Sequence, residues 1–334
     1  MRVPLPWAPD DFAALIRSPD AYTRIGPFRG SPALIVDARS AGAAALLRLR
    51  LPAGFPAVVV GIIDAATRAS GELPAGLDVV AADVDDAQML VRYVDRSPHA
   101  ATVLAQLLRL QDAMTPLDAL AAESLAYATL QSGDEFAGWL ATRGARVRRP
   151  DATPRLRVEH RPDTATAIVT LDRPRVFNLY DAAMRDELVD AMRALVADET
   201  VERIELHGAG RAFCAGGDPA EFGTTRDGAV AHLIRSSANL APLLLAAAPK
   251  LHAHVHGAAV GAGCELAAFA GNVVAAADAT FSLPELSMGL VPGAGGTVSV
   301  TRRIGRHRAA RFAITGDRID APTAQRWGLV DELS

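Results

Sequence analysis

The chain is poor in cysteine, lysine and long apolar runs, and each scarcity excludes a class of protein. Its two cysteines, Cys214 and Cys264, stand in no CxxC or other metal-ligand spacing, which argues against a disulfide framework or zinc module and favours a reducing cytoplasm. Lys250 is the only lysine and the net charge is -4, so the basic clusters typical of nucleic-acid binding are lacking. No apolar run is long enough to span a bilayer, and the start MRVPLPWAPDDF is unlike a signal peptide. The sequence therefore predicts a cytoplasmic protein with no nucleic-acid or membrane partner, and its alanine-rich, lysine-poor composition indicates a bacterial source.

The first half of the 334-residue chain divides into an α/β stretch and a helical stretch. Short apolar runs at 32–38, 55–64 and 76–83, bounded by Pro, Gly or Asp, predict buried strands, and residues 41–51 predict a helix between the first two. Periodic apolar residues then predict helices that begin at Pro98, Pro116 and Asp134. The Arg- and Pro-rich segment 143–155 lacks periodicity and is typical of a linker. We therefore predict an N-terminal α/β and helical region at 1–150 and a second domain at 151–334.

The second half again has an α/β pattern. Residues 156–161 and 166–172 predict a hairpin of strands, and 181–197 form an amphipathic helical pattern. Further strands are expected at 201–208, 250–257 and 272–277, with a helix at 262–270. The fold class predicted from both halves is α/β.

Two glycine-rich junctions in the second half could approach a ligand closely. The first, GAGRAFCAGGDPAEF at 208–222, follows a predicted strand, and the second, HGAAVGAGCELAAF at 256–269, runs from a strand into a helix. A turn that starts a helix exposes free N–H groups at the positive end of the helix dipole. Two such N–H groups from separate junctions could hold a developing oxyanion. Taken alone, each junction is more often simply tight packing.

Two carboxylates strengthen the functional interpretation of these junctions. Glu265 lies in the first turn of the helix that follows the second junction, between Cys264 and Leu266, and Glu285 follows Pro284 in a loop. Because a carboxylate is rarely buried among apolar residues without a purpose, an apolar wall there would raise its pKa towards the range that acid/base chemistry needs. A glutamate that merely stabilises the helix dipole is an equally good account of the spacing alone.

The second half resembles the enoyl-CoA hydratase/isomerase, or crotonase, superfamily. The matching stretches are LDRPRVFNLYD at 171–181, LHGAGRAFCAGGDPAEF at 206–222, the run from Val255 to Gly305 that includes ELSMGLVPGAGGT, and ITGDRIDAPTAQRWGLVDEL at 314–333. The resemblance implies a crotonase-like ββα spiral domain that binds a CoA thioester, preceded by the smaller α/β and helical region.

The resemblance also implies roles for individual residues. The amides of Gly217 and Ala262 would form the oxyanion hole, with Ala262 standing where the family often has glycine. Glu265 and Glu285 would be the catalytic pair, as in family hydratases, whereas isomerases typically keep the position of Glu285. Gly293 would help to shape the site, and the loop of Cys214, Ala215 and Gly216 would line the CoA channel.

The implied activity is that of a lyase of fatty acid metabolism, a hydratase that adds water to a 2-enoyl-CoA. Isomerisation or another crotonase-type reaction on an acyl-CoA is the nearest alternative, and a non-catalytic CoA-binding or assembly subunit is an alternative of a different class. No cofactor is expected beyond the coenzyme A of the substrate. The resemblance further implies a homo-oligomer, a trimer or a multiple of one.

The sequence departs from the family at both ends of the resemblance. The family's C-terminal helical region does not follow GLVDEL, whereas residues 122–144 of the N-terminal half faintly resemble that region. We therefore hypothesise that the helices of 98–143 dock where the family's C-terminal helices would, the alternative being an unrelated appended domain.

Other polar residues invite less specific interpretations. His252, His254 and His256 share one face of a strand, but no carboxylate or cysteine alternates with them at ligand spacing, so no metal site is predicted. Arg302, Arg303 and Arg306 are expected to solvate a helix, with contact to CoA phosphates as the alternative.

Overall fold

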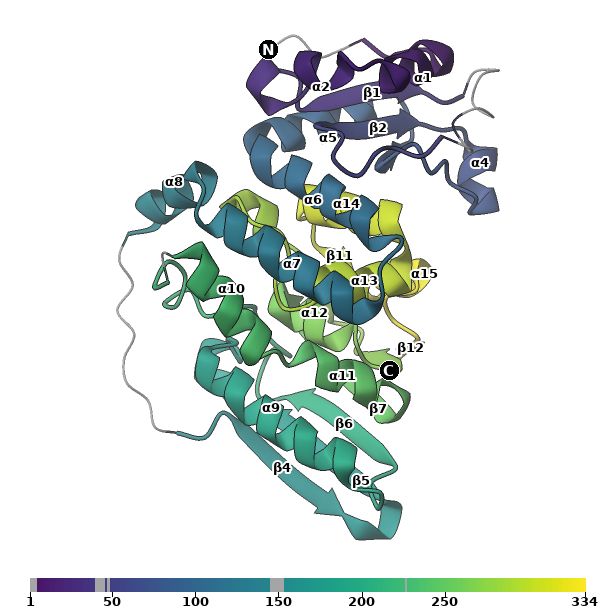
Figure 1. Ribbon diagram of the computed structural model, residues 1–334. Helices are drawn as coiled ribbons and strands as arrows, with labels where there is room; N and C mark the ends of the chain where they lie inside the picture. Colours follow the sequence, from purple (N-terminus) through teal and green to yellow (C-terminus); the bar gives the residue numbers. More distant parts are fainter. Residues whose placement is uncertain (1–4, 40–45, 47–48, 145–152, 226) are drawn as a thin grey trace.

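A small parallel sheet forms the N-terminal end of the molecule. The computed structural model describes residues 5–39, 46, 49–144, 153–225 and 227–334. Strands β1 (Ala33–Asp37), β2 (Val58–Ile62) and β3 (Val79–Ala81) pair in parallel in that order, and helices α1 (Pro9–Arg17) and α5 (Val84–Arg96) pack against them (Figure 1). The three strands predicted here are confirmed. Most of the helix predicted at 41–51 lies outside the described residues.

Three helices follow this sheet, as their sequence periodicity predicts. They are α6 (Pro98–Gln111), α7 (Pro116–Gln131) and α8 (Asp134–Arg143). Both α6 and α7 begin with proline, whose missing N–H costs nothing at a first helical position. Thr115 caps α7 by accepting a hydrogen bond from the backbone N–H of Asp118.

The second half is built on a six-stranded sheet. Its strand order is β12-β9-β7-β6-β5-β4, in which β4 (Leu156–Arg161) and β5 (Thr166–Leu171) form the predicted antiparallel hairpin. The other neighbours pair in parallel: β6 (Arg203–Gly208), β7 (Leu251–Val255), β9 (Asn272–Ala275) and β12 (Glu332–Leu333). Helices α9 (Ala182–Ala197) and α11 (Ala241–Ala247) pack together beside this sheet.

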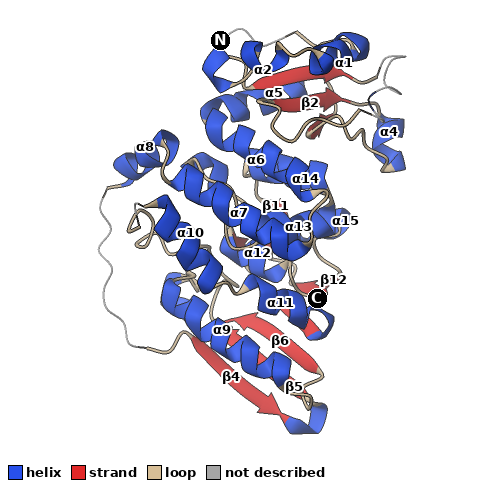
Figure 2. Cartoon of the chain, in the orientation of Figure 1, coloured by secondary structure: helices blue, strands red, loops and turns tan. Residues whose placement is uncertain are grey.

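A second, three-stranded sheet carries the elements that matter for the site. It orders β11 (Ile319–Asp320), β10 (Thr280–Ser282) and β8 (Ala258–Val260), and β8 leads directly into α12 (Ala262–Ala267). After β10 come the short helix η5 (Glu285–Met288) and the helices α13 (Gly296–Ile304), α14 (Arg306–Thr315) and α15 (Ala321–Trp327). Figure 2 shows these helices filling the space between the N-terminal sheet and the six-stranded sheet.

The two predicted regions share a hydrophobic core. Helix α7 packs on α13, and α6 packs on α14 (Figure 1). One cluster of buried side chains accordingly includes Ile35, Leu104 and Phe136 from before residue 150 as well as Leu206 and Val298 from after it. The linker predicted at 143–155 falls largely on residues outside the described part of the chain, and the division at 150 stays a prediction.

The expectation that no apolar run is long enough to span a bilayer needs correction, because the stretch Gly228–Lys250 is long and apolar enough by length and composition alone, with a mean hydropathy of 1.2. The structure divides it between α10 (Gly228–Ser237), α11 and a final turn at Ala248–Lys250. Because core helices pass the same test, the stretch is weak evidence for a membrane span.

Candidate active site

The two glycine-rich junctions lie side by side, as an oxyanion hole built from both would require. The N–H of Cys214 donates to the carbonyl oxygen of Ala258 at 3.0 Å, and the N–H of Val260 donates to the carbonyl oxygen of Cys214 at 3.0 Å. A Cβ on Gly263 would lie 2.3 Å from the carbonyl oxygen of Cys214. Such close approach needs a residue without a side chain, which explains the glycine at this position.

Gly217 and Ala262 both have an N–H group available to a ligand. Ala262 is the first residue of α12, where backbone N–H groups have no partner within the helix. In the described part of the chain, the N–H of neither residue donates to a protein acceptor. The ring of Phe222 lies beside Gly217, since a Cβ there would be 3.2 Å from its Cζ. Both N–H groups are therefore without a protein acceptor among the described residues, and their predicted role in an oxyanion hole stays a prediction.

Glu265 is buried, with a residue exposure of 2%, and its carboxylate is held by the turn before α13. Its Oε2 accepts hydrogen bonds from the N–H groups of Ala294 and Gly296, both at 2.7 Å. Burial raises the pKa of Glu265 to about 7, against the lowering effect of these N–H donors. A carboxyl with that pKa can accept or donate a proton near neutral pH.

Glu285 is the first residue of η5 and points towards the start of α12. A Cβ on Gly261 would lie 2.3 Å from its Oε1, so the carboxyl group lies next to the residue that precedes Ala262. Its Oε2 is buried and, among the described residues, has no hydrogen-bond partner. Burial, reinforced by the charge of Glu265, raises the pKa of Glu285 well above its ordinary value. Both effects favour the protonated form of Glu285 over the ionised form.

The other predicted site residues line the same region. Gly216 adopts φ +102°, and a Cβ there would lie 3.1 Å from the carbonyl oxygen of Val260. The N–H of Ala215 donates to the carbonyl oxygen of Phe177 at 2.9 Å. Burial raises the pKa of Cys214 to about 12, which leaves its thiol protonated and a poor nucleophile.

The sequence analysis missed a residue of α7 that enters this site. Glu123 has a residue exposure of 3%, and its carboxylate accepts from the N–H of Gly295 at 2.7 Å and from the N–H of Thr297 at 2.9 Å. Burial and the charge of Glu265 raise the pKa of Glu123 to about 8. The sequence feature that could have identified Glu123 is the one that identified Glu265: a single glutamate in a stretch of apolar residues.

Tyr127, one turn after Glu123, brings α7 against another predicted residue. A Cβ on Gly293 would lie 2.3 Å from Cδ2 of its ring. Gly293 therefore does shape this region, by admitting the tyrosine ring. The guanidinium of Arg235, on α10, stands 4.0 Å from the centre of the same ring.

Helix α8 covers the other side of the candidate site. A Cβ on Gly289, at the end of η5, would lie 2.6 Å from Cβ of Glu135, so α8 packs closely on the element that carries Glu285. The rings of Phe136 and Trp139 pack on Phe222, with centroids 6.5 and 5.7 Å from its ring. The helices of 98–143 thus pack against the candidate site, and the hypothesis that they take the place of the family's C-terminal helices stays a prediction.

The expectation for two of the three arginines of α13 and α14 is wrong. Arg303 donates to the carbonyl oxygens of Ala268 and Ala270 and pairs with Asp331 at 3.0 Å. Arg306 bonds to the N-terminal unit, through Asp78 at 3.5 Å. Both guanidinium groups serve internal contacts between elements rather than solvation, while Arg302 is exposed as expected.

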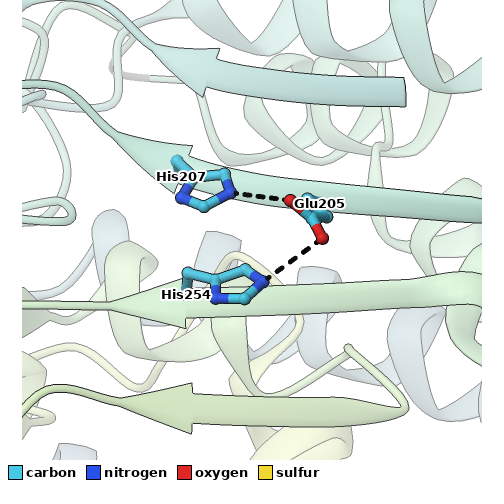
Figure 3. A group of neighbouring side chains, drawn as sticks. All are labelled: Glu205, His207 and His254. Carbon is cyan, nitrogen blue, oxygen red and sulfur yellow. Dashed lines mark hydrogen bonds and ion pairs between the residues drawn. The ribbon is translucent and has the colours of Figure 1, made fainter. Parts of the chain in front are cut away.

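Glu205, His207 and His254 form the one group of donor atoms in the described residues that could hold a metal ion (Figure 3), within 4.8 Å of one another. Two features favour an ion-pair network instead. The imidazole rings stack with centroids 4.4 Å apart and planes 4° apart, so their lone pairs run parallel rather than converge. Arg203 also donates to Oε1 of Glu205 at 2.8 Å. The predicted absence of a metal cofactor stays a prediction.

Comparison with known proteins agrees with this geometry. Residues 162–334 match the family described as enoyl-CoA hydratase/isomerase, over more than half of the chain. The chain belongs to the enoyl-CoA hydratase/isomerase family. It is similar to a probable enoyl-CoA hydratase of Rhizobium meliloti, at 36% identity over 168 residues. It is likewise 36% identical, over 166 residues, to the 2,3-dehydroadipyl-CoA hydratase of Escherichia coli. These alignments cover 50% of this chain and 64% of each relative, so the chain spans less than two thirds of the relatives' length.

Solved structures confirm the family fold for the second half. An enoyl-CoA hydratase from Thermoplasma volcanium matches with a TM-score of 0.51 and 30% identity, over 55% of this chain and 72% of that one. An enoyl-CoA hydratase subunit from Geobacillus kaustophilus matches with a TM-score of 0.50 and 35% identity, over 54% and 68%. The predicted α/β, crotonase-like fold with an additional N-terminal region is therefore confirmed.

Proposed function

We propose that the protein is an enoyl-CoA hydratase that adds water, in the syn sense, across the double bond of a 2-enoyl-CoA thioester. The observation that carries this proposal is the pair of buried carboxyl groups, Glu265 and Glu285, with raised pKa values beside two free N–H groups. Hydratase-named relatives at 36% identity support the same reaction class. In this scheme coenzyme A is part of the substrate, and no other cofactor takes part.

The geometry gives each group one task. Glu265, ionised and held by the N–H groups of Ala294 and Gly296, takes a proton from the attacking water as its oxygen bonds to the β-carbon. The thioester oxygen becomes an enolate oxygen, which the N–H groups of Gly217 and Ala262 stabilise. Glu285, kept neutral by burial, then donates its proton to the α-carbon. The proton gained by Glu265 returns to Glu285 through solvent or product, which restores the starting state.

The test is the loss of enoyl-thioester absorbance when the full chain meets a panel of 2-enoyl-CoA substrates. Glu265→Gln and Glu285→Gln each keep the side-chain shape and remove one acid/base group. Each should lower kcat by about 10² to 10⁴-fold. Glu202→Gln makes the same change at an exposed position and should leave kcat unaltered.

The variants separate the alternatives. An isomerase should survive Glu265→Gln and lose activity in Glu285→Gln, whereas a hydratase loses activity in both. Binding of an acyl-CoA with no turnover on any substrate would instead support a CoA-binding or assembly subunit. We further propose, as a separate matter, that the chain forms a homo-oligomer, which light scattering of the purified protein would test.

A further inference from the structure

Two carboxylates from distant parts of the chain share one backbone turn. Four consecutive N–H groups, from Ala294 to Thr297, alternate between them: Glu265 receives the first and third, and Glu123 the second and fourth. Glu123 lies on α7, 172 positions before Gly295. The turn is therefore held from both sides, by one segment of the family domain and one of the N-terminal helices.

The hydroxyl of Thr297 makes the contact with Glu123 specific. It accepts a hydrogen bond from Nε2 of Gln111 at 2.8 Å, on α6, and so directs its own hydrogen to Oε2 of Glu123 at 2.6 Å. Glu123 thereby accepts three hydrogen bonds while almost fully buried. The first N–H groups of a helix have no acceptor within the helix, so without Glu123 the N–H groups of Gly295 and Thr297 would lack acceptors. Together, Glu265 and Glu123 accept hydrogen bonds from all four N–H groups of the turn.

We propose that Glu123 is a positioning residue, which holds the turn from Ala294 to Thr297 in the conformation that presents two N–H donors to Glu265. The inference rests on the proposed role of Glu265 as the base. If so, the N-terminal helical region has a function in the site, because it provides, from the same chain, the side chain that orients the base. Glu123 itself contacts the turn and no reacting atom.

Charged and titratable groups surround this turn on every side. Glu265 bonds to it from α12, Glu285 of η5 interacts electrostatically with Glu265 and Glu123, and Tyr127 lies on α7 one turn after Glu123. Arg235 of α10 is a cation that interacts with both Tyr127 and Glu123. Because its pKa is raised to about 8, Glu123 is largely protonated while Glu265 titrates, so replacing it by a neutral amide should lower the pKa of Glu265 only slightly, whereas loss of the N–H donors of Glu265 should raise it. The sign of the pKa change therefore distinguishes positioning from a simple charge effect.

Glu123→Gln in the full chain is the decisive variant. Its amide nitrogen cannot accept the hydrogen bonds that one of the two carboxylate oxygens now accepts, so the turn should shift and weaken its hold on Glu265. We expect kcat to fall by about tenfold to a hundredfold with little change in KM. We also expect the acid limb of the kcat/KM profile to move to higher pH. Glu123→Asp restores a carboxyl group with two acceptor oxygens and should recover part of kcat.

Glu187→Gln is the matched control, because Glu187 also accepts two backbone N–H groups, those of Arg155 and Leu156, on another part of the fold. An unchanged kcat in Glu123→Gln, or an acid limb that stays in place or moves to lower pH, would overturn the proposal. If Glu123→Gln fails to fold, Thr297→Val removes only the hydroxyl contact and should shift the profile less, in the same direction.

A second readout keeps this inference separate from the proposed function. Carbon-13 NMR titration of the Glu265 carboxyl in the substrate-free protein reports its pKa whether or not any enoyl-CoA is turned over. An upward shift in Glu123→Gln supports positioning even if the hydratase assay fails. No shift, with a hydratase activity established, would contradict positioning and leave the proposed function intact.

Discussion

At the scale of single residues, Gly261 is under two independent constraints. Its φ is +50°, which residues with a side chain rarely adopt, and a Cβ would lie 2.3 Å from Oε1 of Glu285. Gly261→Ala should therefore displace Glu285 and lower kcat by about a hundredfold in the enoyl-CoA assay. Gly71→Ala is the control, because Gly71 has φ +74° but open space around it. Equal losses in the two variants would show that backbone strain, not displacement of Glu285, is responsible.

Some residues of the candidate site could be predicted from the sequence and others could not, for a physical reason. Glu265 and Glu285 stood out because a carboxylate in an apolar segment is costly to bury. Glu123 has the same local signature, but nothing local says which turn it meets, since its hydrogen-bond partners lie 172 and 174 positions away. The tight approach of Tyr127 to Gly293 is equally a property of the packed structure rather than of either segment.

At the scale of elements, a buried ion pair ties α6 to the N-terminal sheet. Nε of Arg109 donates to Oδ1 of Asp78 at 2.8 Å, and the same guanidinium donates to the carbonyl oxygens of Phe55 and Ala57. Both side chains are at most 3% exposed. Arg109→Met would leave Asp78 buried with a weakened pairing, so the free energy of unfolding should fall by about 3 kcal/mol in denaturant titrations.

Two further variants test that account of Arg109. Arg302→Met removes an exposed arginine and should change stability little. Adding Asp78→Asn to Arg109→Met removes the buried negative charge whose main partner has been lost. The double variant should therefore recover part of the lost free energy of unfolding. A double variant no more stable than Arg109→Met would mean that the contacts of Arg109 with carbonyl oxygens, not the ion pair, matter most.

Elements were predictable where local chemistry marks their ends. Prolines at 98 and 116 begin α6 and α7, and the amphipathic pattern at 181–197 corresponds to α9, which Asp181 caps. The short strand β8 was not predicted, because three small residues carry little strand signal and its pairing with β10 is non-local. The roles of Arg303 and Arg306 also depend on non-local partners, which explains why solvation was the wrong expectation.

At the scale of the whole molecule, the three buried carboxyl groups link stability to pH. The pKa values of Glu265 and Glu123 rise from 4.5 to about 7 and about 8, and that of Glu285 lies well above its ordinary value. A carboxyl whose pKa is raised on folding contributes stability that is complete below its unfolded pKa and is lost as the pH rises through its folded pKa. The melting temperature should therefore fall as the pH rises from about 5, and the fall should level off above about pH 8.

Other groups act little in the upper part of that interval, above about pH 7. The carboxyl groups whose pKa values are lowered, Asp37 and Asp86 among them, are ionised in both states well below pH 7. His252 and His254, whose pKa values are also lowered, are largely neutral in both states by that pH. The double variant Glu123→Gln, Glu285→Gln replaces two raised carboxyl groups by neutral amides, so its melting temperature should decline less over the same interval. A decline as steep as that of the unaltered protein would place the source of the pH dependence outside this carboxyl cluster.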